Sequence, residues 1–192
     1  AFTTLDDLVA AYTALLAPAA SNFAMTTAVE STFGTSANDT FTATSLTLQG
    51  GDVIVDSSST DSDTLIVTAT DDITATATVV GIESVTFNLN AITTSTGVAS
   101  TFDVALNNVN ATSITIGNNS TSSPVTSAAV TNVASGANIT FADHFDTVTV
   151  TAIDNAAITV NTGTTTASST SLAIAGATVD AATVNAAGAL TM

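Results

Sequence analysis

The 192-residue chain contains no lysine and no arginine, and its sixteen acidic residues, fourteen Asp and two Glu, give it a formal net charge of −16. Because it has no cationic side chains to neutralise phosphates, nucleic-acid binding loses its main electrostatic contribution. Attraction to an anionic membrane surface fails for the same reason. The expected counter-charge is therefore dissolved divalent cations.

Other absences narrow the class of protein further. The chain has no Cys, which excludes disulfides and thiolate metal sites. No run of eighteen apolar residues occurs, so we expect no membrane insertion. We also do not expect an enzyme. Polysaccharide lyases on β-helical folds need a cationic residue to abstract a proton or stabilise negative charge, and His144 is more typical of an exposed turn.

What the chain does contain is β-forming sequence. Apolar residues make up 45% of it, which is too many for a disordered acidic tail. They are mostly Ala and Val set among many Thr and Ser, and β-branched side chains suit a pleated, half-buried surface. The composition therefore predicts a folded, mainly β protein.

The N-terminal segment carries the clearest helical pattern. Thr4 can cap a helix whose first turn holds Asp6 and Asp7, and Pro18 ends it. One apolar stripe follows the 3.6-residue period, and we expect it to contact another copy of the protein: Leu5, Leu8, Val9, Tyr12, Leu15 and Leu16. A short second helix is expected over 21–33. Residues 1–33 are thus predicted to be a helical segment.

Short β-type runs separated by Asn, Gly, Asp and Ser fill residues 34–192, which are predicted to form a β-rich domain. Strands are expected at 41–48, 53–55, 64–68, 73–80, 84–89, 102–106, 113–116, 138–141, 147–151, 157–160, 171–174 and 183–185. Several alternate strictly, as in Ile114/Ile116 and Val148/Val150.

Two architectures fit these strands. A β-solenoid stacks small side chains in a narrow core, which suits Ala, Val and Thr with Asn-rich corners. A β-sandwich is the alternative, with a core that Phe87, Phe102, Phe141 and Phe145 could supply. The small interior residues favour the solenoid.

Seven acidic residues gather in one region of the chain. They are Asp39, Asp52, Asp56, Asp61, Asp63, Asp71 and Asp72. Ca²⁺ takes six to eight oxygen ligands from carboxylates, carbonyls and waters, so closely spaced Asp residues on loops are a suitable ligand set. The alternative is solvated loop charge, and the repeating calcium-binding nonapeptide is absent.

Two stretches resemble a known family. The N-terminus, with AFTT at 1–4 and LVAAYT at 8–13, is similar to the start of bacterial S-layer proteins of the Caulobacter kind, which are exported by type I secretion. A segment of those and related calcium-dependent surface proteins resembles GTSANDTF at 34–41, LQGGD at 48–52, DTL at 63–65 and GIESV at 81–85. The resemblance covers about the first ninety residues.

The resemblance implies a secreted, extracellular protein with a β-solenoid that assembles on the bacterial cell surface with calcium and contacts cell-surface polysaccharide. Together with the charge and the strands, it predicts a structural subunit that self-assembles as a homopolymer into an extracellular surface layer or filament, dependent on Ca²⁺. The alternative function is a calcium-binding adhesion module that binds a glycan or a host surface.

Overall fold

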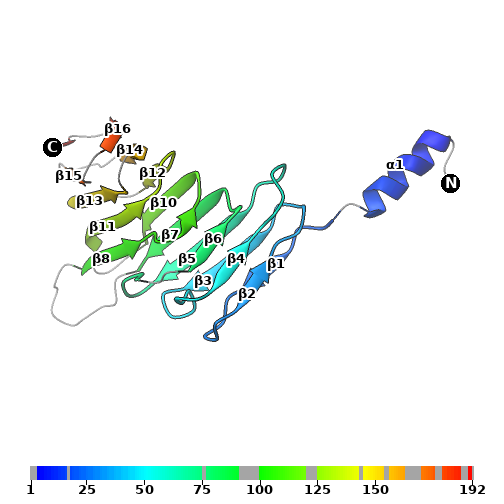
Figure 1. Ribbon diagram of the computed structural model, residues 1–192, viewed down its shortest axis with the longest axis horizontal. Helices are drawn as coiled ribbons and strands as arrows, with labels where there is room; N and C mark the ends of the chain where they lie inside the picture. Colours follow the sequence, from blue (N-terminus) through cyan, green and yellow to red (C-terminus); the bar gives the residue numbers. More distant parts are fainter. Residues whose placement is uncertain are drawn as a thin grey trace.

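The computed structural model describes residues 4–16, 18–74, 77–90, 100–119, 125–142, 145–153, 156–162, 170–175, 179–186 and 190–191. The protein is a β-solenoid of parallel strands preceded by one short helix, α1 (Leu5–Leu16) (Figure 1). The predicted mainly β fold is confirmed in its solenoid form, and the sandwich does not form. Among the described residues, no helix has the length and apolar character needed to cross a membrane.

Three parallel sheets form the walls of the solenoid. The long sheet contains β1 (Asn22–Ala24), β3 (Thr40–Thr44), β5 (Thr64–Ala69), β7 (Ser84–Leu89), β10 (Ser113–Asn118), β12 (Asn138–Phe141), β14 (Ala156–Thr162) and β16 (Val179–Ala186). The N-terminal side sheet contains β2 (Ser31–Phe33), β4 (Val53–Val55), β6 (Thr78–Val80) and β9 (Val109–Asn110). The C-terminal side sheet contains β8 (Ser100–Ala105), β11 (Val125–Val133), β13 (Thr147–Ala152), β15 (Thr170–Ala175) and β17 (Leu190–Thr191).

Side chains of like type stack along the solenoid axis to form its core. In one column of the long sheet, residues paired strand to strand run Phe23, Phe41, Leu65, Val85, Ile114, Ile139 and Val160. Alternate residues point inward, so β5 and β7 bury every second side chain. All four Phe residues proposed for a sandwich core are buried inside the solenoid instead.

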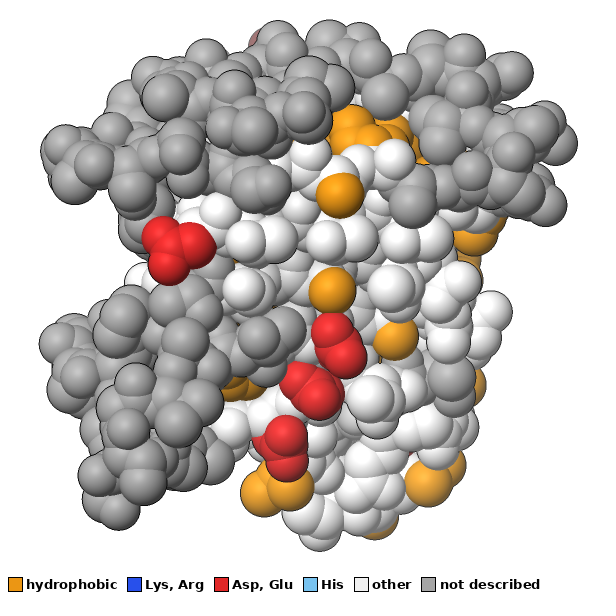
Figure 2. Space-filling model, turned by 90° about the vertical axis from the view of Figure 1, so that its left-hand side faces the viewer, with side chains coloured by type: hydrophobic (Ala, Val, Ile, Leu, Met, Phe, Trp, Pro, Cys, Tyr) orange, Lys and Arg blue, Asp and Glu red, His pale blue; other side chains and the backbone are white. Residues whose placement is uncertain are grey.

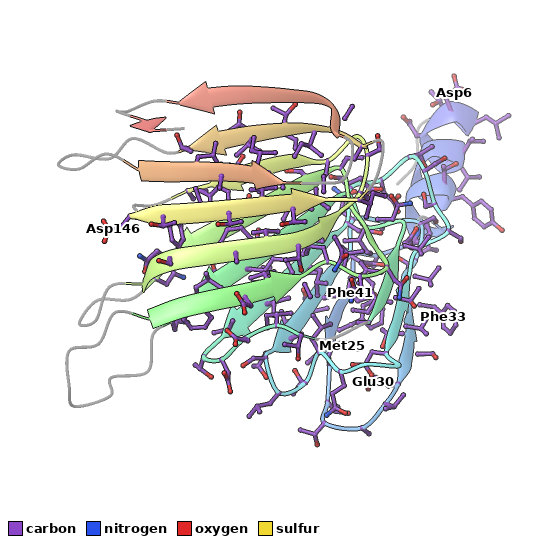
Figure 3. All side chains as sticks on the ribbon, turned by 60° about the vertical axis from the view of Figure 1, so that its left-hand side comes forward. Asp6, Met25, Glu30, Phe33, Phe41 and Asp146 are labelled. Carbon is purple, nitrogen blue, oxygen red and sulfur yellow. The ribbon has the colours of Figure 1, made fainter. Side chains whose placement is uncertain are left out.

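The first coil begins earlier than the sequence pattern indicates. The expected second helix over 21–33 is wrong, because β1 and β2 occupy this range and start two of the sheets. Phe23 stacks on Phe41 with ring centroids 4.9 Å apart, and Met25 is buried beside them. Figure 3 shows Met25 and Phe41 on the inner side of the sheets and Phe33 on the outside. Packing of these apolar side chains on the next coil overrides local helix preference.

Candidate metal centre

A ladder of acidic residues marks the points where strands of the long sheet begin. Asp39, Asp63 and Glu83 lie directly before β3, β5 and β7. The Ser21 N–H donates to Asp39 Oδ1 at 2.6 Å, the Asp39 N–H donates to Asp63 Oδ1 at 2.7 Å, and the Asp63 N–H donates to Glu83 Oε2 at 2.8 Å. Each carboxylate thus holds the backbone of the coil before it, which offsets the cost of burying Asp39 and Asp63.

Two of the buried aspartates have both carboxylate oxygens occupied by protein donors. Asp52 accepts from the Glu30 N–H at 3.0 Å and from the Gln49 N–H at 2.6 Å. Asp39 accepts from the Ser21 and Thr35 N–H groups. Their role is to tie coils together, and neither belongs to the group of carboxylates that approach one another closely enough to share an ion.

Asp56, Asp61 and Asp63 do form such a group. Asp56 follows β4, and the other two precede β5, so the connection between these strands brings all three together. Each offers a carboxylate oxygen within 4.8 Å of those of the other two. Four of their oxygens are buried without a hydrogen-bond donor: Asp56 Oδ2, Asp63 Oδ2 and both oxygens of Asp61. Asp56 is 4% exposed and Asp63 is fully buried.

Buried carboxylate oxygens without donors are costly unless a cation or a proton compensates them. The three aspartates offer oxygen ligands alone, with no sulfur or imidazole, which suits a hard cation better than a transition metal. They therefore could hold a metal ion, and backbone carbonyls and waters would complete its coordination.

Two glycines let the backbone approach Asp56. A Cβ on Gly34 would lie 2.3 Å from Asp56 Oδ2, so this carboxylate packs directly on the Gly34 backbone. Gly81 has a φ of +74°, and a Cβ there would lie 2.0 Å from the Asp56 backbone oxygen. A larger residue at either position would displace Asp56.

We expect Gly81→Ala to destabilise the protein by about 2–5 kcal/mol, because it adds a backbone clash to the cost of a left-handed alanine. Gly136→Ala is the matched control: its φ is +86°, but no atom lies within 4 Å of the added methyl group, so about 1–2 kcal/mol is expected. Urea denaturation of both variants checks the difference. Equal losses would show that the close contact with Asp56 does not exist in solution.

The environment of the three carboxylates changes the pKa of Asp63. Burial raises this pKa above the ordinary value of 3.8, the hydrogen bond from the Asp39 N–H opposes the rise, and the charges of Asp56, Asp61 and Asp39 add to it. Without metal, Asp63 therefore stabilises the fold most when protonated, and this contribution is lost as the pH rises through the raised pKa.

A metal ion competes with that proton. We expect the stabilisation by Ca²⁺ to be largest at neutral pH and to shrink as the pH falls through the raised pKa of Asp63 toward 3.8. Melting curves with CaCl2 or EGTA across this range check it. A calcium effect that is constant with pH would contradict a carboxylate site.

Asp39 behaves differently. Burial alone would raise its pKa, but hydrogen bonds from Thr35 and Ser21 outweigh burial and lower it, so its contribution to stability is lost below pH 3.8.

The structure separates the seven aspartates predicted as metal ligands. Asp56, Asp61 and Asp63 come together, while Asp39 and Asp52 are buried in backbone hydrogen bonds. Asp71 and Asp72 are exposed beyond the far end of β5, where Asp72 Oδ1 accepts the Asp103 N–H at 2.9 Å. The sequence prediction overlooked Glu83, although its place before β7 repeats that of Asp63 before β5. His144 lies outside the described residues.

The predicted contact stripe of α1 is open to solvent wherever its side chains are described. The exposed fractions are Leu5 73%, Leu8 48%, Val9 56%, Tyr12 62% and Leu15 81%, and the side chain of Leu16 lies outside the described ones. The Thr4 hydroxyl accepts the Asp7 N–H at 3.1 Å, and Asp7 Oδ2 accepts the Thr4 N–H at 3.0 Å. A reciprocal capping pair thus begins the helix.

Comparisons of the chain with protein-family models, with curated proteins and with solved structures give no match. The functional argument therefore depends on the site and the surfaces of this chain.

Proposed function

We propose that the protein is a secreted structural subunit that assembles with copies of itself into an extracellular surface layer or filament, and that Ca²⁺ bound by Asp56, Asp61 and Asp63 supports this assembly. The observation that carries the proposal is that the long sheet has an unpaired edge at both ends of the described solenoid. The outer edges of β1 and β16 pair with no strand of the described chain. Natural solenoids that remain monomeric need terminal caps with a polar outer face.

Features of the N-terminal end support the stacking of a second copy there. The core column ends at Phe23, which stacks on Phe41 on one side and is partly exposed. Phe33 and Val29 near the same end are 66% and 63% exposed. Edge strands that remain single usually carry Lys, Pro or a covering element, and β1, with the sequence Asn-Phe-Ala, has no Lys or Pro. A second solenoid stacked in parallel would extend both the hydrogen bonds and the core column.

Calcium would support this assembly by neutralising negative charge. With a net charge of −16 and no Lys or Arg, each copy repels every other copy. Figure 2 shows a row of acidic side chains on one face of the molecule, with no basic side chain beside them. Bound Ca²⁺ lowers the repulsion and fixes the connection between β4 and β5, close to the open end.

Sedimentation and negative-stain microscopy of purified protein titrated with CaCl2 and then EGTA test the proposal. Ordered sheets or fibres that form with calcium and dissolve with EGTA are the expected result. Assemblies that persist in EGTA would support the structural role and show that it does not depend on calcium. Protein that stays monomeric at every calcium concentration would overturn the proposal in favour of a monomeric adhesion module.

A further inference from the structure

A groove of about 830 Å³ lies on the side of the solenoid where the N-terminal side sheet ends. β9 is the last strand of that sheet, and every described strand that follows it belongs to the long sheet or to the C-terminal side sheet. The groove runs from β6 across residues 106–110 to the ends of β11 and β13. It is therefore a step in the outer wall of the solenoid.

The lining of the groove combines apolar side chains with a neutral polar rim. Val80 and Ile153 are 41% and 44% exposed there, so each offers part of a large aliphatic side chain to the groove. Asn108, Asn110 and Asn132 are exposed around them. None of the described residues that line the groove is acidic. In a chain of net charge −16, such a surface can accept an acidic partner with little repulsion.

The one helix of the described chain is an apolar element without a covering partner. Its stripe is 48–81% exposed at Leu5, Leu8, Val9, Tyr12 and Leu15. A helix of twelve residues is only marginally stable in water without packing on one face. An amphipathic helix of this kind commonly gains that packing by laying its apolar face in a groove.

We propose that α1 of one copy docks in this groove on a second copy. The inference rests on the proposed self-assembly and names its contact. The dimensions agree. Leu5 to Leu15 spans about 15 Å along a helix at about 1.5 Å per residue. The groove crosses three strand spacings, from β6 through the β8–β9 coil and β11 to β13, or about 14 Å at about 4.8 Å each.

The second copy is a better source of the helix than the chain itself. Figure 1 shows α1 beyond β1, projecting away from the solenoid. The residues that line the groove lie on or directly beside β6, β9, β11 and β13. The acidic residues of the helix, Asp6 and Asp7, are in its first turn, so the neutral groove faces the apolar remainder. Docking between copies would leave each N-terminal helix on its neighbour and link the copies sideways as well as end to end.

Disulfide trapping tests this contact cleanly, because the chain has no cysteine of its own. Two variants, Leu8→Cys and Val80→Cys, are mixed with CaCl2 and mildly oxidised. We expect the mixed dimer to form at least tenfold faster than with the control pair Leu8→Cys and Thr42→Cys, since Thr42 is exposed on the outer face of β3. Adding Ile153→Asp to the Val80→Cys chain should abolish this advantage. Circular dichroism establishes that each variant is folded.

Equal rates for the Val80 and Thr42 pairs would overturn the inference. So would a monomeric disulfide in the double variant Leu8→Cys/Val80→Cys with no mixed dimer between single variants, because α1 would then occupy the groove of its own chain. Sedimentation of the same samples separates the two proposals. Ordered assemblies without the selective disulfide would support self-assembly and reject this contact. A selective dimer without ordered assemblies would support the contact and reject assembly into a layer or filament.

Discussion

Calcium at a hundred times its Kd is expected to stabilise the metal-free protein by about 2.7 kcal/mol. For a chain of this length that gain corresponds to a rise in Tm of about 5–10 °C. The reason is that four buried carboxylate oxygens of Asp56, Asp61 and Asp63 have no donor in the protein, and a cation would compensate them all. Differential scanning calorimetry with CaCl2 and with EGTA measures the shift.

The variant Asp61→Asn should abolish the calcium shift and also raise the Tm in EGTA. The substitution removes one of three mutually repelling charges, and the amide can donate to the open oxygens of its neighbours. Asp71→Asn is the matched control, since it removes the same charge from an exposed position away from the three carboxylates, and the calcium shift should persist. Loss of the shift in both variants, or in neither, would refute the assignment of the site.

The second large effect is expected in the core. Phe87→Ala should destabilise the protein by about 3–5 kcal/mol, because the side chain is almost fully buried and its removal leaves a cavity. Phe87 pairs with Val67 on one neighbouring strand and with Ile116 on the other, so the cavity opens in the middle of a core column. Urea denaturation measures the loss.

The neighbouring residue supplies the comparison for this prediction. Thr86 lies on the same strand with its side chain on the opposite, half-buried face, and Thr86→Ala should cost below about 1 kcal/mol. If the two variants lost equal stability, the inward face of β7 would be assigned wrongly. The register of the whole long sheet would then be in question, because a slip of one residue exchanges the two faces.

The sequence predicted most of the strands because their alternation is strong. Ile114 and Ile116 on β10, and Val148 and Val150 on β13, each point inward with Ser, Thr or Gly between or beside them. β11 was missed, since its inner residues include the small Ala128, which gives a weak pattern. β1 and β2 were missed because Asn-Phe-Ala and Ser-Thr-Phe lack the run of β-branched residues that marks the equally short β4, and pairing with the next coil determines their conformation.

From the sequence, the three aspartates of the candidate metal site could be identified only as members of a larger set of seven. Closely spaced Asp residues identified the right region, but sequence spacing does not distinguish a carboxylate that caps a backbone N–H from one that is open to an ion. Asp39 is two dozen residues from Asp63 in the chain and directly beside it in the ladder, with its N–H on Asp63 Oδ1. That contact depends on the length of one solenoid coil, which varies from 18 residues between the starts of β1 and β3 to 29 between those of β7 and β10.

The two proposals together describe an assembly with two directions of growth. Stacking at the β1 and β16 ends would give a filament, and docking of α1 in the groove beside β9 would join filaments into a sheet. The candidate metal site of Asp56, Asp61 and Asp63 lies near the first of these proposed contacts. A variant with an acidic residue in the groove, such as Ile153→Asp, is expected to form filaments that do not associate into sheets.

Isothermal titration of CaCl2 into EGTA-treated, dialysed protein is the most direct measurement of whether Asp56, Asp61 and Asp63 form a calcium site. We predict saturable binding to the wild-type protein and to Asp71→Asn, with one ion fewer bound by Asp61→Asn. Binding of the same number of ions with the same affinity by all three proteins would contradict the site, and with it the role of calcium in the proposed assembly.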